Sequence, residues 1–297
     1  MANDKYIRFD WAAKKILRDK SNFCILEGLV TVLLDEPVHI IELLEKESYL
    51  PDNSDINDRI CFKAINAKNE IILVEIHTTR LLYFYECISF DVTASFTEHI
   101  QLGNKYDQVK KVYSISILYF DLGKGEDYIY RDQTTFRGMT KNDTLQITAK
   151  ERDTIHMKAP EEVFPEYYLI RVNAFNKIAE NHLDEWIKYL KDGEIDENTT
   201  APGLQEAKRK LEYMSMSKSE KLAYDEHLNA IMIQNDVIGT ARIEGLAEGR
   251  AEGRAEGRAE GMRKSQLDIA SKMKANGMTL EMIVQCTGLS AEEIEKL

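Results

Sequence analysis

The chain has 297 residues, of which 43% are hydrophobic and 30% charged, and it carries a formal net charge of −12. This length and balance predict one substantial core with appendages, and the acidic charge excludes a protein whose whole surface binds nucleic acid while leaving room for a local basic groove. No segment is long and apolar enough to cross a bilayer, and the amino terminus has no apolar signal core. Widely scattered cysteines without a metal-binding pattern predict reduced thiols in a soluble, cytoplasmic protein. These cysteines are Cys24, Cys61, Cys87 and Cys286.

Helical and strand-like patterns alternate over the first two thirds of the chain. We expect helices at 10–20, 24–35, 80–101, 173–180 and 182–192. We expect strands at 38–44, 58–65, 71–77, 112–120 and 167–172, and a smaller hairpin formed by 128–131 and 144–148. The order predicts an α/β fold in which helices flank a mixed sheet.

The strand expected at 71–77 is almost purely apolar but contains Glu75 and ends on His77. Side chains alternate along a strand, so Glu75 and His77 share one face. Burying both costs free energy unless a cation, a partner or a hydrogen bond compensates. A strand end that emerges into solvent is the simpler alternative, and this strand alone leaves both open.

Aromatic residues are dense in the helix expected at 80–101. At this density they favour packing against a sheet over stacking on bases. They are Tyr83, Phe84, Tyr85, Phe90 and Phe96.

The last third of the chain divides by composition into three parts. Residues 201–240 are helical and polar, and 241–262 contain the repeat AEGR. As a helix, the repeat would place glutamates in one row and arginines in another, so that it could pair with a second copy; a flexible linker is the alternative. Residues 263–297 predict three short helices that resemble a helix-turn-helix, the third opened by a capping box at Ser290. Five basic and five acidic residues cancel there, which favours a small cap for protein interaction or oligomerisation over DNA binding.

Several segments together carry a resemblance to a known family. They are FDWAAKKILRDKSNF (9–23), LEGL (26–29), IILVEIHTTR (71–80), TEHIQLGNKY (97–106), KKVYSISILYFDLGKG (110–125), FPEYYLIRVNAFN (164–176), and the glutamate-glycine repeat followed by TGLSAEEIEKL (287–297). Over nearly its whole length the chain resembles the bacterial Rpn family of recombination-promoting nucleases, or transposases, in the PD-(D/E)xK superfamily. The resemblance implies a restriction-endonuclease-like core over 1–200 with a helical C-terminal extension.

The resemblance also implies metal-dependent cleavage of DNA. In that family two acids from adjacent strands hold Mg²⁺, a glutamate on the first helix often helps, and a lysine or glutamine orients water and substrate. Mg²⁺ prefers hard oxygen ligands and lowers the pKa of a bound water. Carried onto this chain, the metal ligands are Glu75 and Glu27, and His77 occupies the lysine or glutamine position.

The second acid is where this chain departs from the family. Counting back along the hairpin from Glu75 places the aspartate position at Cys61. A thiol is soft and largely protonated near neutral pH, so it is a poor Mg²⁺ ligand. Asp58 cannot easily replace the missing acid. It lies three residues before Cys61, so its side chain points to the other face of the sheet and is about 10 Å away along the strand.

The chain also departs from the family at two other positions where the resemblance implies a functional residue. His77 can donate a hydrogen bond but supplies no hard oxygen, and Cys87 follows Glu86 where relatives tend to have an arginine that could meet phosphate. The sequence therefore predicts an eroded DNA endonuclease with weak or no activity. The alternative is a catalytically inactive nuclease-fold protein that acts as a binding or oligomeric assembly module.

Two other interpretations of Cys61 are open at this point. Together with Glu75 and His77 it could form a softer site, for instance for Zn²⁺. It could equally be a small buried residue with an apolar role, a frequent fate for cysteine.

Overall fold

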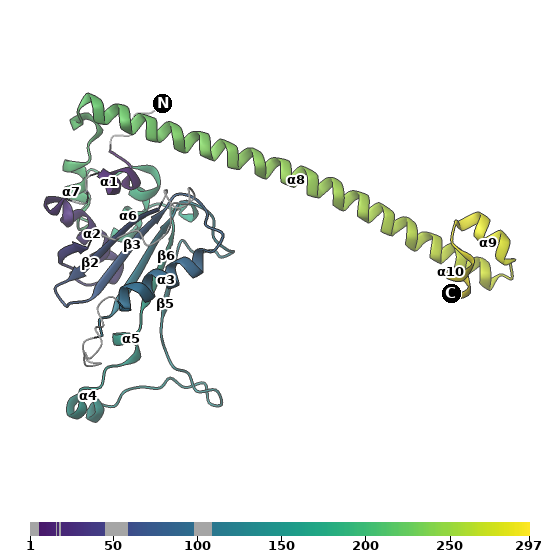
Figure 1. Cartoon of the computed structure of the whole chain (residues 1–297), viewed down its shortest axis with the longest axis horizontal. Helices are drawn as coiled ribbons and strands as arrows, with labels where there is room; N and C mark the ends of the chain where they lie inside the picture. Colours follow the sequence, from purple (N-terminus) through teal and green to yellow (C-terminus); the bar gives the residue numbers. More distant parts are fainter. Residues whose placement is uncertain (1–5, 16, 18, 45–58, 98–108) are drawn as a thin grey trace. The chain divides into compact units, whose positions relative to one another are not determined.

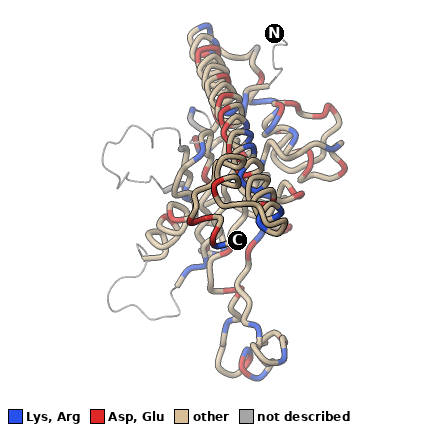
Figure 2. The backbone as a smooth tube through the Cα atoms, turned by 90° about the vertical axis from the view of Figure 1, so that its right-hand side faces the viewer, with Lys and Arg blue, Asp and Glu red and all other residues tan. Residues whose placement is uncertain are grey.

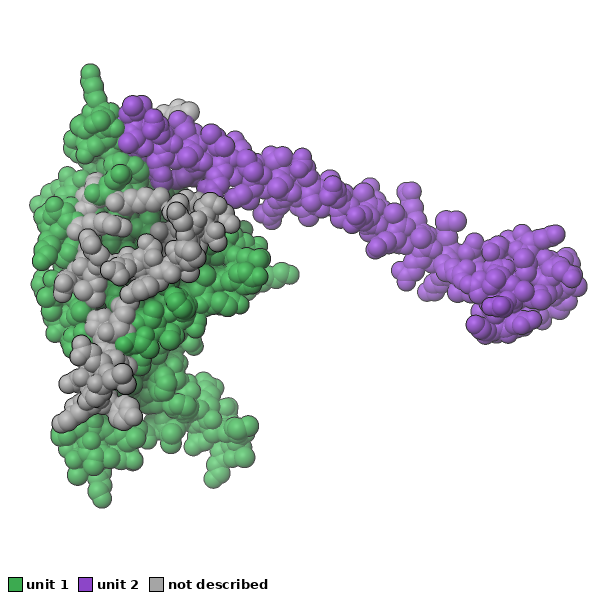
Figure 3. Space-filling view, in the orientation of Figure 1, with its two compact units in different colours: residues 1–221 green, residues 222–297 purple. Residues whose placement is uncertain are grey.

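The computed structural model describes residues 6–15, 17, 19–44, 59–97 and 109–297. It divides into two compact units, Met1–Lys221 and Leu222–Leu297 (Figure 3). Asp58 and most of the segment 97–106 lie outside the described residues.

A mixed six-stranded sheet forms the centre of the first unit (Figure 1). Its strands, in spatial order, are β1 (Ile40–Leu44), β2 (Arg59–Asn66), β3 (Ile71–His77), β4 (Val112–Leu118), β6 (Glu166–Arg171) and β5 (Ile129–Gln133). The pairs β3–β4 and β4–β6 are parallel, and the other three are antiparallel. Every residue of β3 and β4 is buried, which explains why both strands have near-continuous apolar sequences. The predicted α/β class with a mixed sheet is confirmed.

Helices cover both faces of this sheet. On one face, α3 (Phe84–Thr97) packs Val92 and Phe96 against Ile71, Leu73 and Val112. On the other side lie α1 (Phe9–Lys15), α2 (Phe23–Leu34) and α6 (His182–Asp192) (Figure 1). The central strands are therefore enclosed from both sides.

The first unit continues past residue 200 through α7 (Leu204–Lys210), which packs against α2. The approach is close: a Cβ built on Gly28 would lie 2.3 Å from the carbonyl oxygen of Pro202. The Ile7 amide also donates to the Leu211 carbonyl at 2.8 Å. These contacts extend the compact unit to Lys221, about twenty residues beyond the boundary expected from composition.

Residues 134–165 form a long excursion between β5 and β6 that contains α4 (Ala149–Ile155) and α5 (Pro160–Val163) (Figure 1). The predicted hairpin of 128–131 with 144–148 is wrong, because β5 pairs with β6 instead. Thr148 caps α4 through a capping box, which ends any strand there.

The helix predicted at 173–180 is also wrong. Only a short 3₁₀ turn, Val172–Ala174, forms, and the next helix begins after its cap Asn181. Two further 3₁₀ turns are Lys20–Asn22 and Tyr213–Ser215.

The second unit is built on α8 (Lys218–Ala275), a helix of 58 residues that includes the whole AEGR repeat. The repeat is therefore helical rather than a flexible linker, and charges of both signs are interleaved along it (Figure 2). Beyond it, α9 (Leu280–Thr287) and α10 (Ala291–Glu295) pack on the end of α8 around Ala270, Ile283, Leu289 and Ile294. The capping box predicted at Ser290 is confirmed. No helix in the described ranges is long and apolar enough to span a membrane.

Candidate functional site

Buried polar side chains gather between the sheet and α3. Strand register places the sheet members on the face that carries Ile71 and Leu73, which α3 covers, and the helix members lie on the buried side of α3. Each is at most 4% exposed. We call this set the polar layer: Lys63, Glu75, His77, Asp91, Ser95, Ser114 and Ser116. A polar layer inside an otherwise apolar core costs free energy, so its position marks the candidate site.

Cys61 stands directly across from Glu75 in the β2–β3 ladder, as counting along the hairpin predicted. On its other side Glu75 has Ser116 of β4 as its partner. Directly opposed residues point to the same face of a sheet, so a thiol and a hydroxyl flank this carboxylate. Cys61 itself is partly exposed.

Glu75 and His77 are buried together beneath the start of α3. They are 1% and 2% exposed, so the alternative of a strand end emerging into solvent is wrong. The His77 ring meets the ring of Phe84 edge-on at 5.3 Å, and its Nε2 lies 3.6 Å from Glu75 Oε2, beyond hydrogen-bond distance. Within the described part of the chain, neither ring nitrogen of His77 nor the hydroxyl of Ser116 has a hydrogen bond. Such groups would be stabilised by a ligand or water that supplied one.

Glu27 lies elsewhere. Its Oε1 accepts a hydrogen bond from the amide of Ile40 at 2.7 Å and lies 2.8 Å from Nδ1 of His39. Because Ile40 pairs with Asn66, at the turn that precedes β3, this contact is about 17 Å along the strand from Glu75. The structure therefore does not bring Glu27 to Glu75. The Glu27 carboxylate instead links α2 to the start of β1 by its hydrogen bond with Ile40.

At the position where the family resemblance implies a second acid, this chain has the thiol of Cys61 across from Glu75. Across the described ranges, no three His, Cys, Asp or Glu side chains come together closely enough to hold a metal ion. Cys61, Glu75 and His77 all lie within these ranges and do not form such a group, so the alternative of a zinc site has no geometric support. Glu75 is the acid that remains at the expected position.

Sequence reasoning missed another buried carboxylate, Glu166 at the start of β6, outside the polar layer. It binds Lys111 Nζ at 2.7 Å and Arg131 Nε at 2.6 Å, and Tyr168 OH donates to it at 2.6 Å. Burial opposes its ionisation, but these hydrogen bonds outweigh burial and hold the pKa of Glu166 below its usual value. No local signal could have found it, because Lys111 and Arg131 are 55 and 35 residues away in sequence.

The predicted role of the aromatic helix needs correction. Phe84 is buried and Phe96 packs on the core, but Tyr83, Tyr85 and Phe90 are 64%, 58% and 58% exposed. Tyr83 lies just before α3, and Tyr85 and Phe90 lie outside the apolar core that the buried side of the helix covers. They form an outer aromatic surface.

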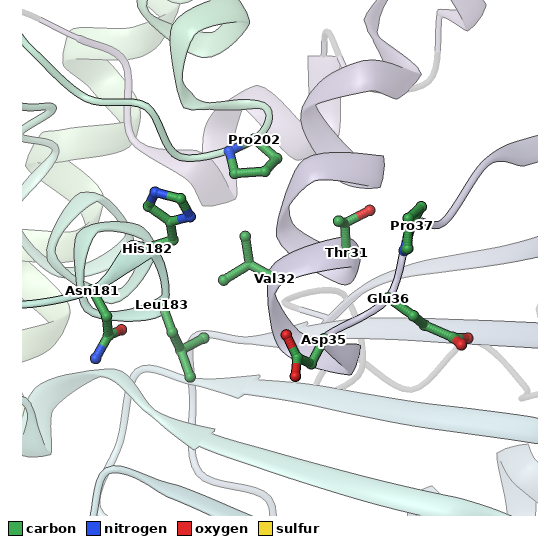
Figure 4. Close-up of a pocket in the computed structure, with 9 residues that line it drawn as sticks. All are labelled: Thr31, Val32, Asp35, Glu36, Pro37, Asn181, His182, Leu183 and Pro202. Carbon is green, nitrogen blue, oxygen red and sulfur yellow. The ribbon is translucent and has the colours of Figure 1, made fainter.

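A cavity of about 440 Å³ lies apart from the polar layer, between the end of α2 and the start of α6 (Figure 4). Asp35 and Glu36 line it from one side and His182 from the other (Figure 4). None of the residues predicted for the site lines this cavity.

Comparison with known proteins agrees with this architecture. Residues 7–241 match the model of the PD-(D/E)XK nuclease family transposase. The chain belongs to this family. In this PD-(D/E)XK protein, residues 263–297 match the C-terminal HTH domain of the Rpn/YhgA-like nuclease family, which confirms the resemblance to Rpn proteins. PD-(D/E)XK nucleases generally use a divalent metal ion. A search of curated proteins and a search of solved structures each find no match.

Proposed function

We propose that this PD-(D/E)XK protein binds DNA and cleaves it weakly or not at all, because its catalytic centre has lost the second acid. The observation that supports this most strongly is the position of Cys61 directly across from Glu75. An aspartate there would face Glu75 from the neighbouring strand at the spacing that two metal-binding acids need. A thiol offers neither charge nor a hard oxygen at neutral pH.

A divalent ion, when bound between two acids, polarises the phosphate and activates water. In this chain Glu75 would supply one ligand, and His77 could orient a phosphate or a water by donating a hydrogen bond. Neither residue replaces the missing oxygen ligands. We therefore infer that Mg²⁺, the ion expected for an active member, binds weakly here.

The test is to restore the site. The double variant Cys61→Asp, His77→Gln should gain Mg²⁺-dependent cleavage of plasmid DNA that the wild type lacks. The same double variant with Glu75→Ala added is the matched control and should be inactive. Erosion is contradicted if the wild type already cleaves and Glu75→Ala abolishes the cleavage.

Metal binding can be measured separately from cleavage. Calorimetric titration of the metal-free wild type with Mg²⁺ and with Mn²⁺ should show no binding at millimolar ion concentrations. Binding that disappears in Glu75→Ala would mean that the site works without its aspartate, and would overturn the inference of a lost metal centre.

A second candidate function, an oligomeric assembly module, is favoured by α8. Of its 58 residues only Tyr224 and Ala270 are buried, so its surface is available to another chain. In a homo-oligomer, the glutamate row of one AEGR repeat would face the arginine row of another. Sedimentation velocity over a hundredfold concentration range tests this proposal, and a single monomeric species throughout would refute it.

DNA is the proposed partner in both cases, with the C-terminal HTH domain as a further contact. The cytoplasm is the proposed compartment, because it keeps cysteines such as these four reduced and none of them forms a disulfide.

A further inference from the structure

A second cavity lies on the α3 side of the sheet, between α3 and the β5–β6 edge. It encloses about 290 Å³ and has largely apolar walls. Its lining includes three tyrosines, two aliphatic residues and one acid: Tyr85, Tyr130, Tyr167, Ile88, Leu169 and Asp132. We call it the tyrosine pocket.

The tyrosine pocket lies on the same face of the sheet as Glu75. Leu169 pairs with Ser116, and Ser116 pairs with Glu75, so two strand spacings, about 10 Å, separate Leu169 from Glu75. Glu75 is covered by α3, whereas Tyr85 and Tyr130 at the pocket remain 58% and 37% exposed. A DNA strand reaching this face would meet the tyrosines without any movement of α3.

The walls suit a flat, neutral ring. The volume is at the small end of the range for ligand pockets, roughly 300–1,000 Å³, so it fits one planar group rather than an extended ligand. Tyrosine rings offer faces for stacking, and every nucleobase has a matching face. Arg131 and Asp132 both line the pocket, and their opposite charges disfavour a purely cationic or anionic occupant.

A positively charged side chain, Arg171, lies beside the pocket and could bind a phosphate of the DNA backbone. The guanidinium of Arg171 lies 5.9 Å from the centre of the Tyr130 ring and donates to the backbone carbonyls of Gly125 and Asp127, at 3.0 and 3.3 Å. In the part of the chain that the structure describes, no carboxylate pairs with it, and its buried Nε has no hydrogen bond. Arg131, by contrast, is already paired with Glu166. Arg171 is therefore the cation available to a phosphate.

Asp132 gives the pocket an acceptor. Burial raises the pKa of the Tyr167 phenol, and the charge of the nearby Asp132 raises it further. A carboxylate in this position can accept a hydrogen bond from an exocyclic amino group, such as N4 of cytosine, which thymine lacks.

We propose that the tyrosine pocket binds one unstacked nucleobase of single-stranded or locally opened DNA. The base stacks on the tyrosines, its amino group bonds Asp132, and the adjoining phosphate meets Arg171. This inference rests on the proposed DNA binding and names the form of DNA that the protein recognises.

The first test compares two exposed tyrosines of the same segment. Tyr85 lines the pocket and Tyr83 does not, although the two are similarly exposed, at 58% and 64%. Fluorescence anisotropy with a labelled oligo-dC should show about a tenfold loss of affinity for Tyr85→Ala, the effect of losing one stacked base, and less than a twofold loss for Tyr83→Ala. Equal effects of the two variants, or no effect of Tyr85→Ala, would overturn the proposal.

The second test concerns base choice and charge. Wild type should bind oligo-dC more tightly than oligo-dT, and Asp132→Ala should bring the two affinities together. Arg171→Gln should weaken both and lower the slope of log affinity against log salt by about one. A dC preference that survives in Asp132→Ala, or an unchanged slope in Arg171→Gln, would contradict the assigned contacts.

A duplex control separates this pocket from DNA binding in general. If wild type binds duplex and single strands but the pocket variants match it, only the tyrosine pocket is refuted. If wild type binds neither, the proposed function fails as well.

Discussion

Glu166 illustrates how a single buried charge is kept ionised in this fold. Its side chain is 2% exposed, that of Lys111 9%, and that of Arg131 53%, so the cluster reaches from the core to the surface. The pKa of Glu166 is held down because its hydrogen bonds outweigh the cost of burial. A carboxylate with a lowered pKa in the folded state stabilises the fold above its unfolded-state pKa, and this stabilisation is lost as the pH falls.

We expect Glu166→Gln to lower the free energy of unfolding by about 3 kcal/mol at pH 7, since it leaves the half-buried Lys111 without its counter-charge. The difference from wild type should shrink as the pH falls below 4.5, the usual value for glutamate, toward the lower pKa of the folded state. Urea unfolding at pH 7 and pH 3.5 measures it. Glu206→Gln, which removes an exposed i,i+3 pair with Arg209, is the control and should change stability by less than about 0.5 kcal/mol. A pH-independent difference would contradict the assignment.

The pairing of residues across the β2–β3 hairpin was predictable from sequence, and the contacts of the remaining site residues were not. A short turn between two apolar runs sets the register, so Cys61 could be placed opposite Glu75 by counting. Glu27 could not be placed, because its position depends on how α2 meets β1. Glu166 could not be identified for the same reason, because Lys111 and Arg131 come from segments far away in the sequence.

At the level of elements, glycines in helices play two opposite roles in this chain. Gly28 in α2 permits the close approach of the loop at Pro202 and Gly203, with no room for a Cβ. Gly253 in α8 has nothing within 4 Å of the corresponding position. The same substitution should therefore have opposite effects at the two sites.

Gly28→Ala should destabilise the first unit by about 2 kcal/mol, because overpacking against backbone outweighs the gain in helix propensity. Thermal unfolding followed by circular dichroism measures this loss. Gly253→Ala should stabilise α8 locally by about 1 kcal/mol and slow amide hydrogen exchange across 245–261 about fivefold. Destabilisation by both variants would mean that another chain packs closely on Gly253.

Strand β3 was predicted at its observed bounds because a buried apolar run ends at polar turns on both sides. The hairpin predicted from 128–131 and 144–148 does not form, because β5 pairs with β6, which is more distant in the sequence. Local pattern identified the strand but not its neighbour. Tertiary pairing decided the topology.

For the molecule as a whole, the middle of α8 is notable because no residue between Tyr224 and Ala270 of this helix is buried. Helices that lack packing open locally at little cost, and proteases act on such openings. Trypsin at low concentration should therefore cut first at Arg250, Arg254 and Arg258, leaving both ends of the chain as stable fragments. Mass spectrometry of a time course identifies the first cuts. Protection of these arginines that disappears on dilution would instead support the homo-oligomer.

The AEGR repeat also has a consequence for how this protein can change over generations. Tandem DNA that encodes identical four-residue units gains and loses copies readily. Each unit adds about 6 Å to a continuous α-helix and turns whatever follows by about 40°, since four residues slightly exceed one turn. A change in copy number would therefore alter the length of α8 and the rotation of the C-terminal HTH domain about the axis of that helix in fixed steps, without altering the residues of the first unit or of the HTH domain.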